Sequence, residues 1–126
     1  MFKFFRNFFL LSIFTISSAY AIGDAFDQAV FDRLLKEGKP VLIAVHADWC
    51  ATCRAQEIFL KDLLKTPPYN NLQVLRVDFD RQKKAVRAFR VRMQSTLIVF
   101  KNGKEIDRST ADTDRESVAL MLRKAL

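Results

Sequence analysis

The sequence predicts one α/β domain with a mixed four-stranded sheet and helices on both faces. Half of the 126 residues are hydrophobic, which supplies one core and no more. The run Val41 to His46 is short, continuous and mostly apolar, as in a central strand buried on both faces. Helical patterns precede and follow this run, and Asn102-Gly103 later forms a strong two-residue hairpin signal.

The first half of the domain is predicted to be helix, strand, helix. Asp24 is the expected cap of a helix that extends to about Glu37. Its apolar stripe consists of Phe26, Val30, Phe31, Leu34 and Leu35. After the strand Val41–His46, a second helix is expected from about Cys50 to Lys65. Its apolar pattern is Ala55, Ile58, Phe59 and Leu63, and Pro67-Pro68 ends it.

The second half is predicted to be strand, helix, hairpin, helix. The ranges expected for the strands are Leu72–Phe79, Thr96–Lys101 and Lys104–Arg108. Asp80 is expected to begin the intervening helix, which turns Ala85, Val86 and Phe89 inward. Thr113 to Glu116 has the pattern of a capping box. The helix that follows offers Val118, Leu120, Met121, Leu122 and Leu126 to the core. Strand–helix–strand units imply parallel pairing, and the closing hairpin is antiparallel.

Residues 1–21 have the pattern of a secretory signal peptide, which leaves 22–126 as the domain. Lys3 and Arg6 precede an uncharged apolar run, and Ala19-Tyr20-Ala21 is a small-x-small cleavage site. The alternative is an uncleaved membrane anchor, but the uncharged run from Phe8 to Gly23 is shorter than the ~20 residues of a typical span. We therefore expect export, to the periplasm or an equivalent compartment.

The charge of the domain is basic. Loss of Lys3 and Arg6 from the 21 basic residues leaves 19, against 14 acidic residues. A basic surface is compatible with nucleic acid, a membrane or an acidic protein, or with a solvated surface that has no partner. For an exported domain nucleic acid is the poorest of these, and we expect contact with the membrane only during export.

The chemistry is predicted to reside in Cys50 and Cys53, the only two cysteines. They lie where a buried strand passes into a helix, with Cys50 at or next to the N-cap. Free N–H groups and the partial positive charge of a helix N-terminus favour a thiolate, so Cys50 is the expected nucleophile. Cys53 is one turn further on and is expected to resolve the mixed disulfide. In an oxidising compartment such a pair is better suited to redox exchange than to structural cross-linking, because the loop it closes is tiny.

Trp49-Cys50-Ala51-Thr52-Cys53 between strand and helix, followed by Ser95 to Gly103, resembles the thioredoxin family in order and spacing. The resemblance covers almost all of the chain after residue 22. It implies a thioredoxin-like fold and a thiol:disulfide oxidoreductase that acts on protein partners through a redox-active disulfide, with no other cofactor. It also implies that Trp49 packs over the cysteine pair and lines the substrate surface. A monomer is expected.

Three departures from the family pattern limit what the resemblance implies. Ser95 stands where family members usually have a cis-proline, and we expect the Gln94–Ser95 bond to be trans because a non-proline cis bond costs roughly 2.5–4 kcal/mol. Loss of this proline could slow release of mixed disulfides, could admit a metal or an iron–sulfur cluster, or could simply relax the loop. Ala44 stands at the position of the usual buried aspartate, so the proton acceptor for Cys53 must be water or another group. Glu57 and Asp78 are the candidates, or else simple surface or capping residues.

The third departure is the uncharged pair Ala51-Thr52 between the cysteines, where the Thr52 hydroxyl either donates to the Cys50 sulfur or faces water. The residues expected to shape the site or bind the substrate are Trp49, His46, Ala51, Thr52, Gln94, Ser95 and Thr96, with Met93 in the same partner-binding loop. His46 either approaches the Cys50 thiolate or is a plain rim residue. Arg54 and Arg92 either add positive potential near the thiolate or point to solvent.

Two other classes of function remain open. A metal-binding module would use His46, Asp48 and the two cysteines, although zinc sites need four ligands in tetrahedral array. A docking or chaperone module on the same fold would not need the cysteines to react.

Overall fold

The computed structural model describes residues 21–126, so the predicted signal peptide lies outside the described residues except for Ala21. Across residues 21–126, no helix is both long and apolar enough to span a bilayer.

The sheet has five strands in the order β1-β3-β2-β4-β5. Their bounds are β1 Asp24–Ala25, β2 Val41–His46, β3 Gln73–Asp78, β4 Thr96–Lys101 and β5 Lys104–Thr110. β3 runs parallel to β2, whereas β4 is antiparallel to β2 and to β5. The predicted mixed sheet is confirmed, and β1 adds a fifth strand to the four expected. The parallel pairing implied for the strand after α3 is wrong, because β4 is antiparallel to β2.

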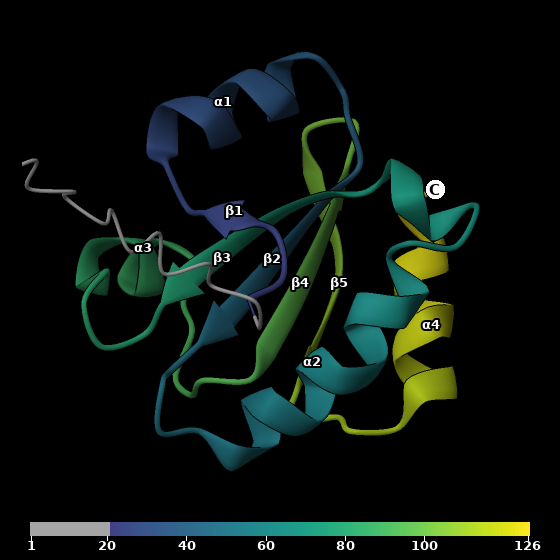
Figure 1. Cartoon of the computed structure of the whole chain (residues 1–126). Coiled ribbons are helices and arrows are strands. Elements are labelled where there is room, and N and C mark those ends of the chain that lie inside the picture. The colour runs from purple at the N-terminus through teal and green to yellow at the C-terminus, as the bar shows by residue number, and fades with distance from the viewer. Residues whose placement is uncertain (1–20) are drawn as a thin grey trace, which may run out of the picture.

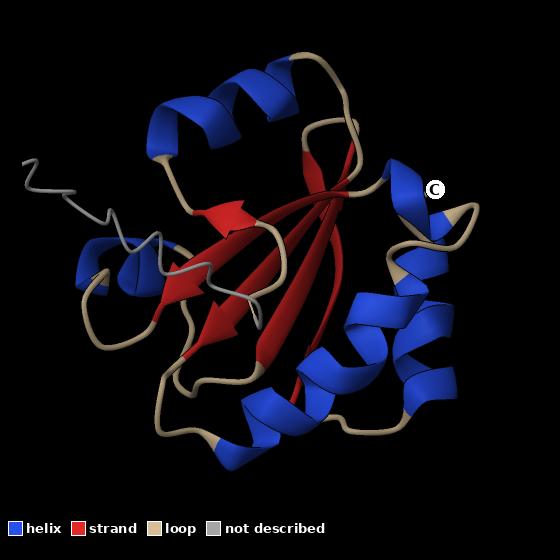
Figure 2. Ribbon diagram, viewed as in Figure 1, coloured by secondary structure: helices blue, strands red, loops and turns tan. Residues whose placement is uncertain are grey.

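Helices cover both faces of this sheet, as Figures 1 and 2 show. The helices are α1 Gln28–Lys36, α2 Ala51–Leu63, α3 Lys83–Ala88 and α4 Arg115–Arg123, with a 3-10 turn, η1, at Tyr69–Asn71. Side chains of α1 and α3 pack in one cluster on one face, and those of α2 and α4 pack in a second cluster on the other.

The side chains of β2 alternate between these two clusters. Val41, Ile43 and Val45 pack with α1 and α3, whereas Leu42 and Ala44 pack with α2 and α4. None of the five is more than 5% exposed. Successive side chains of a strand point to opposite faces, so a strand covered on both sides must be apolar throughout. The predicted central strand is therefore confirmed.

The prediction that Asp24 caps the first helix is wrong. Asp24 and Ala25 form β1, which pairs in parallel with β3. The cap is Asp27, which has an extended backbone and whose carboxylate accepts a 3.0 Å hydrogen bond from the Val30 N–H. Asp27, three residues after Asp24, was not considered as a cap. Asp24 is drawn into the sheet instead, where β1 pairs with backbone groups along the edge of β3.

The third helix begins at Lys83, later than predicted. The Asp78 carboxylate accepts from the N–H groups of Asp80 and Arg81, at 3.0 and 2.9 Å, which holds this stretch in a turn. The Gln82 side chain then bonds the Phe26 carbonyl and the Asp78 N–H, both at 2.9 Å. This turn ties the end of β3 to the segment between β1 and α1.

The apolar faces of α2 and α4 also differ from the prediction. Ile58 is 73% exposed and Leu120 61% exposed, so neither belongs to the core. The cap of α4 is Asp114, which accepts a 2.7 Å hydrogen bond from the Ser117 N–H, so Thr113 is not the cap. The buried residues of α2 are Cys53, Gln56, Leu60 and Leu63. A polar glutamine thus occupies a core-facing position that an apolar pattern would not include.

Candidate active site

Cys50 is the N-cap of α2, as the sequence predicted. Its backbone is extended (φ −85°, ψ 107°), and its Sγ accepts a 3.1 Å hydrogen bond from the Cys53 N–H. The two cysteines form a disulfide with their Cα atoms 5.3 Å apart. A sulfur at this place faces the unpaired N–H groups of the first turn, which stabilise negative charge.

Both cysteines are buried, with Cys50 2% exposed and Cys53 3% exposed. They pack with Ala47 and the half-buried Phe79 in a small cluster of their own. The Cys53 Sγ lies 3.9 Å from the Val45 carbonyl oxygen. The sequence placed the pair at a helix N-terminus but did not show how little of it reaches solvent.

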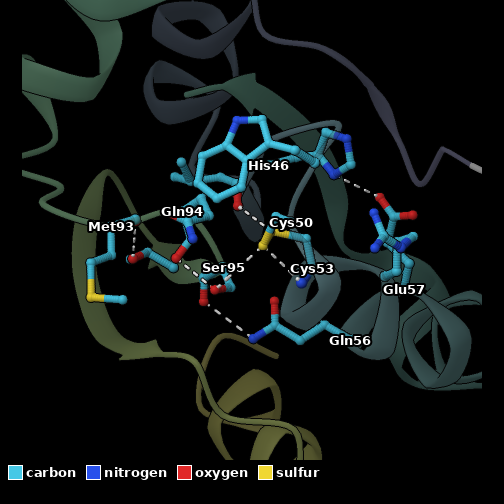
Figure 3. Close-up of a disulfide and its surroundings, with 12 residues drawn as sticks. His46, Cys50, Cys53, Gln56, Glu57, Met93, Gln94 and Ser95 are labelled. Carbon is cyan, nitrogen blue, oxygen red and sulfur yellow. Dashed lines mark hydrogen bonds and ion pairs between the residues drawn. A yellow bond between two sulfur atoms is a disulfide. The ribbon is translucent and has the colours of Figure 1, made fainter. Parts of the chain in front are cut away.

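Ser95, the residue directly before β4, faces the disulfide (Figure 3). Its Oγ lies 4.0 Å from the Cys50 Sγ and donates a 2.6 Å hydrogen bond to the Gln94 carbonyl. Its φ is +58°, in the left-handed region. The Gln94–Ser95 bond is trans, as expected, and the cis bond found within residues 21–126 is Pro67–Pro68.

Gln56 connects the active-site helix to this segment, and sequence analysis missed it. It is 3% exposed, and its Nε2 donates to the carbonyls of Ser95 and Asp112, at 3.2 and 2.9 Å. Because both partners only accept, the amide nitrogen must be the atom that faces them. A polar residue three positions after Cys53, on the helix face that carries that cysteine, was the available signal.

The His46 ring contacts two carboxylates and is turned toward Glu57 in Figure 3. Its Nδ1 lies 3.2 Å from Glu57 Oε1, and its Nε2 lies 3.3 Å from Asp48 Oδ1. The buried Nδ1 is close enough for an ion pair but lacks hydrogen-bond geometry toward Glu57. His46 therefore belongs to a charged cluster behind the disulfide, and its ring contacts are carboxylates.

A small cavity of about 10 Å³ lies beside Cys53, and Ala44 is among the residues that line it. Its lining includes His46, Glu57 and Arg76, whereas Asp78 does not take part. This volume holds about one water molecule. Of the two carboxylates considered as proton acceptors for Cys53, only Glu57 has access to the space next to it.

Trp49 is 60% exposed, and its indole Nε1 donates a 2.7 Å hydrogen bond to Asp80 Oδ2. Asp80 follows the turn at Asp78, whose carboxylate is also 2.9 Å from the Arg81 guanidinium. Burial raises the pKa of Asp78, but hydrogen bonds from Arg81 and Asp80 outweigh it and hold this pKa below its ordinary value. The turn after β3 thus anchors the tryptophan beside the cysteines.

The other predicted site residues surround the pair in different ways. Ala51 is exposed, Thr52 and Gln94 are half-buried, and Thr96 is buried. The Thr96 hydroxyl donates a 2.8 Å hydrogen bond to the Met93 carbonyl, which holds the loop before β4, and Met93 itself is 49% exposed. Arg54 donates to the Asp48 carbonyl at 3.1 Å, whereas Arg92 is exposed. Within the described part of the chain, no three His, Cys, Asp or Glu side chains are grouped to hold a metal ion.

Comparison with known proteins agrees with this arrangement. The protein-family model for thioredoxin matches residues 22–124 of the chain. The chain belongs to the thioredoxin family. A thioredoxin from Chlamydia muridarum is 33% identical over 84 residues, which are 67% of this chain and 80% of that protein. With its Cys50–Cys53 pair joined in a disulfide, this family member is a thiol:disulfide oxidoreductase.

Solved structures show the same fold. The crystal structure of Trxlp from Edwardsiella tarda is 40% identical with a TM-score of 0.77, covering 79% of this chain and 96% of that one. Fasciola hepatica thioredoxin matches with a TM-score of 0.71 over 83% of this chain and 100% of that one. At 21% identity, the second likeness concerns the fold alone.

Proposed function

We propose that this thioredoxin-family protein exchanges dithiol and disulfide with protein partners outside the cytoplasm, with Cys50 as the nucleophile and Cys53 as the resolving thiol. The observation that carries the assignment is the position of Cys50 at the N-cap of α2, where its sulfur accepts the Cys53 N–H at 3.1 Å. That hydrogen bond and the helix terminus stabilise charge on Cys50, and Cys53 lies one turn deeper.

In the reducing direction, the Cys50 thiolate attacks one sulfur of a partner disulfide and the other partner sulfur leaves as a thiolate. The Cys53 thiolate then attacks the Cys50 sulfur, which releases the second partner thiolate and closes the Cys50–Cys53 disulfide. Two electrons pass to the partner, and the reverse sequence oxidises a partner dithiol. No further cofactor is needed for either direction.

The partner is proposed to dock over the exposed Trp49 and Met93, beside Gln94 and Ser95. Because Cys50 is only 2% exposed, docking must move the exposed side chains of Trp49 or Met93 before a partner sulfur can reach the Cys50 sulfur. Binding energy from the docked partner then supports the rearrangement, so exchange is expected to favour folded or extended protein partners over small disulfides.

Reduction of insulin disulfides in the presence of a small dithiol tests this proposal. Wild-type protein should turn over, Cys50→Ser should not, and Cys53→Ala should accumulate mixed disulfides that gels without reductant reveal. Ser109→Ala, on β5, is the matched control, because it changes a side chain of similar size away from the two cysteines. Partner binding that is equal in wild type and Cys50→Ser, with no turnover in either, would instead indicate a docking module.

Export is proposed from the pattern of residues 1–21 alone. Expression of the full chain followed by fractionation and N-terminal sequencing should give a periplasmic product that begins at Ile22. A product that retains Met1 in the membrane fraction would indicate an uncleaved anchor.

Zinc and iron content of the purified protein should be far below one atom per chain, and size-exclusion chromatography should give a monomer.

A further inference from the structure

The Ser95 hydroxyl has a position and a burial that the exchange reaction described above does not use. Ser95 is 1% exposed, and its Oγ is 4.0 Å from the Cys50 Sγ. It approaches from the β4 side, whereas the Cys53 N–H approaches the same sulfur from α2. The nucleophilic sulfur therefore has a hydroxyl on one side and a helix N–H on the other (Figure 3).

The backbone of Ser95 is fixed on three sides. Its N–H donates to the Val45 carbonyl at 2.8 Å, and its carbonyl accepts from the Ala111 N–H at 3.0 Å and from Gln56 Nε2 at 3.2 Å. These bonds hold the residue at φ +58°, a conformation that costs a non-glycine residue roughly 1–2 kcal/mol. The strained backbone places Cβ and the hydroxyl next to the disulfide.

In the disulfide form the hydroxyl bonds the Gln94 carbonyl at 2.6 Å, because a disulfide sulfur carries no charge and is a weak acceptor. Reduction changes this competition. A hydroxyl proton can rotate about the Cβ–Oγ bond, and a charged acceptor forms a hydrogen bond about twice as strong as a neutral one.

We propose that, when the pair is reduced, the Ser95 hydroxyl turns from the Gln94 carbonyl to the Cys50 sulfur and stabilises it as a thiolate. The inference rests on the proposed function, since it assumes that Cys50 is the nucleophile. Ser95 is then a direct donor to the reacting sulfur. Two consequences follow: Cys50 reacts at lower pH than the helix terminus alone would allow, and the reduced protein is favoured over the disulfide, which makes the protein a stronger oxidant.

The rival donor is Thr52, the other hydroxyl close in sequence. Thr52 is half-buried on the first turn of α2, and in residues 21–126 its hydroxyl makes no hydrogen bond to Cys50. Ser95 and Thr52 therefore make opposite predictions for the same measurement.

The test measures the rate of alkylation of Cys50 against pH in the Cys53→Ala background, for Ser95→Ala, Ser95→Gly and Thr52→Ala. Alanine removes the hydroxyl and keeps the backbone cost, whereas glycine removes both, so a shared effect belongs to the hydroxyl. Both Ser95 variants should move the alkylation midpoint to higher pH. At pH values below the midpoint, they should lower the alkylation rate by about fivefold, a typical effect of one hydrogen bond. Thr52→Ala should match the parent.

A second readout is the redox equilibrium of the intact Cys50–Cys53 pair with glutathione. It is measured at a pH above the alkylation midpoints of both the parent and the Ser95 variant. Loss of the hydroxyl should favour the disulfide by the same factor of about five, which is about 20 mV at 29.6 mV per factor of ten. Both Ser95 variants should fold, which far-UV circular dichroism checks. If Ser95→Ala does not fold, Ser95→Gly still provides the test, because glycine adopts a positive φ without strain.

Unchanged midpoints in both Ser95 variants, a shift in Ser95→Gly only, or a shift in Thr52→Ala that equals theirs would overturn the inference. Each of these results leaves the proposed function intact if wild type still reduces insulin and Cys50→Ser does not. Loss of that contrast would instead remove the proposed function, whatever the midpoints show.

Discussion

Gln56 allows the strongest quantitative prediction, because a single buried amide links α2 to two other segments. Gln56→Met keeps the length of the side chain and removes its donor, so the change isolates the hydrogen bonds to Ser95 and Asp112. The Ser95 carbonyl keeps its bond from the Ala111 N–H, so only the Asp112 carbonyl loses its donor.

Each net hydrogen bond contributes about 0.5–1.5 kcal/mol, so the free energy of unfolding should fall by about 2 kcal/mol. With a urea m-value of about 2 kcal/mol/M for a small domain, the unfolding midpoint should fall by about 1 M. The assay is urea unfolding of the oxidised protein, followed by circular dichroism.

Gln28→Met is the matched control. Gln28 is exposed on α1, and its amide makes one 2.8 Å hydrogen bond to Asp32. Its loss should change the free energy of unfolding by no more than about 0.5 kcal/mol. If Gln56→Met costs no more than Gln28→Met, the two buried bonds do not stabilise the fold and the reasoning fails.

Three further predictions concern the cap of α4, the turn after β3 and the resolving step. Asp114→Ala should lower the free energy of unfolding by about 1 kcal/mol and Thr113→Ala should not, since only Asp114 accepts the Ser117 N–H; equal losses in urea unfolding would restore the capping box. The pKa of Asp78 is lower in the folded chain than in the unfolded one, so its stabilisation is complete above pH about 4 and is lost as the pH falls through the folded value. The stability difference between wild type and Asp78→Asn should therefore shrink in urea unfolding below pH 4, and a constant difference would contradict this. Glu57→Gln should slow release of the mixed disulfide by about tenfold, a modest share of typical proton-transfer catalysis, without changing the alkylation rate of Cys50. Rapid acid quench followed by non-reducing gels measures the decay of the mixed disulfide, and an unchanged rate would exclude Glu57 as the proton acceptor.

The sequence was informative wherever one local signal had one interpretation. The run Val41 to His46 predicted a central strand because a strand buried on both faces must be apolar at every position. The pair Asn102-Gly103 predicted the β4–β5 hairpin because both central residues of that turn need positive φ, and both have it, at 51° and 79°.

The sequence failed where packing between elements decided the outcome. The cap of α1 was predicted at Asp24 but is Asp27, because pairing of β1 with β3 takes Asp24 into the sheet. Ile58 and Leu120 have the character of core residues, yet the orientation of α2 and α4 on the sheet left both exposed. Such outcomes depend on packing between elements, which a local pattern does not contain.

At the active site the sequence by itself determined the identity, spacing and helix position of the two cysteines, because the apolar strand run before Cys50 and the helical pattern after it place Cys50 at the start of the helix. Only the tertiary structure decided which groups meet the sulfurs. Ser95 lies 45 residues after Cys50, which it contacts, and 39 residues after Gln56, which donates to its carbonyl. The physical reason is that these contacts form when β4 docks against β2 and α2, so they exist only once the whole sheet has assembled.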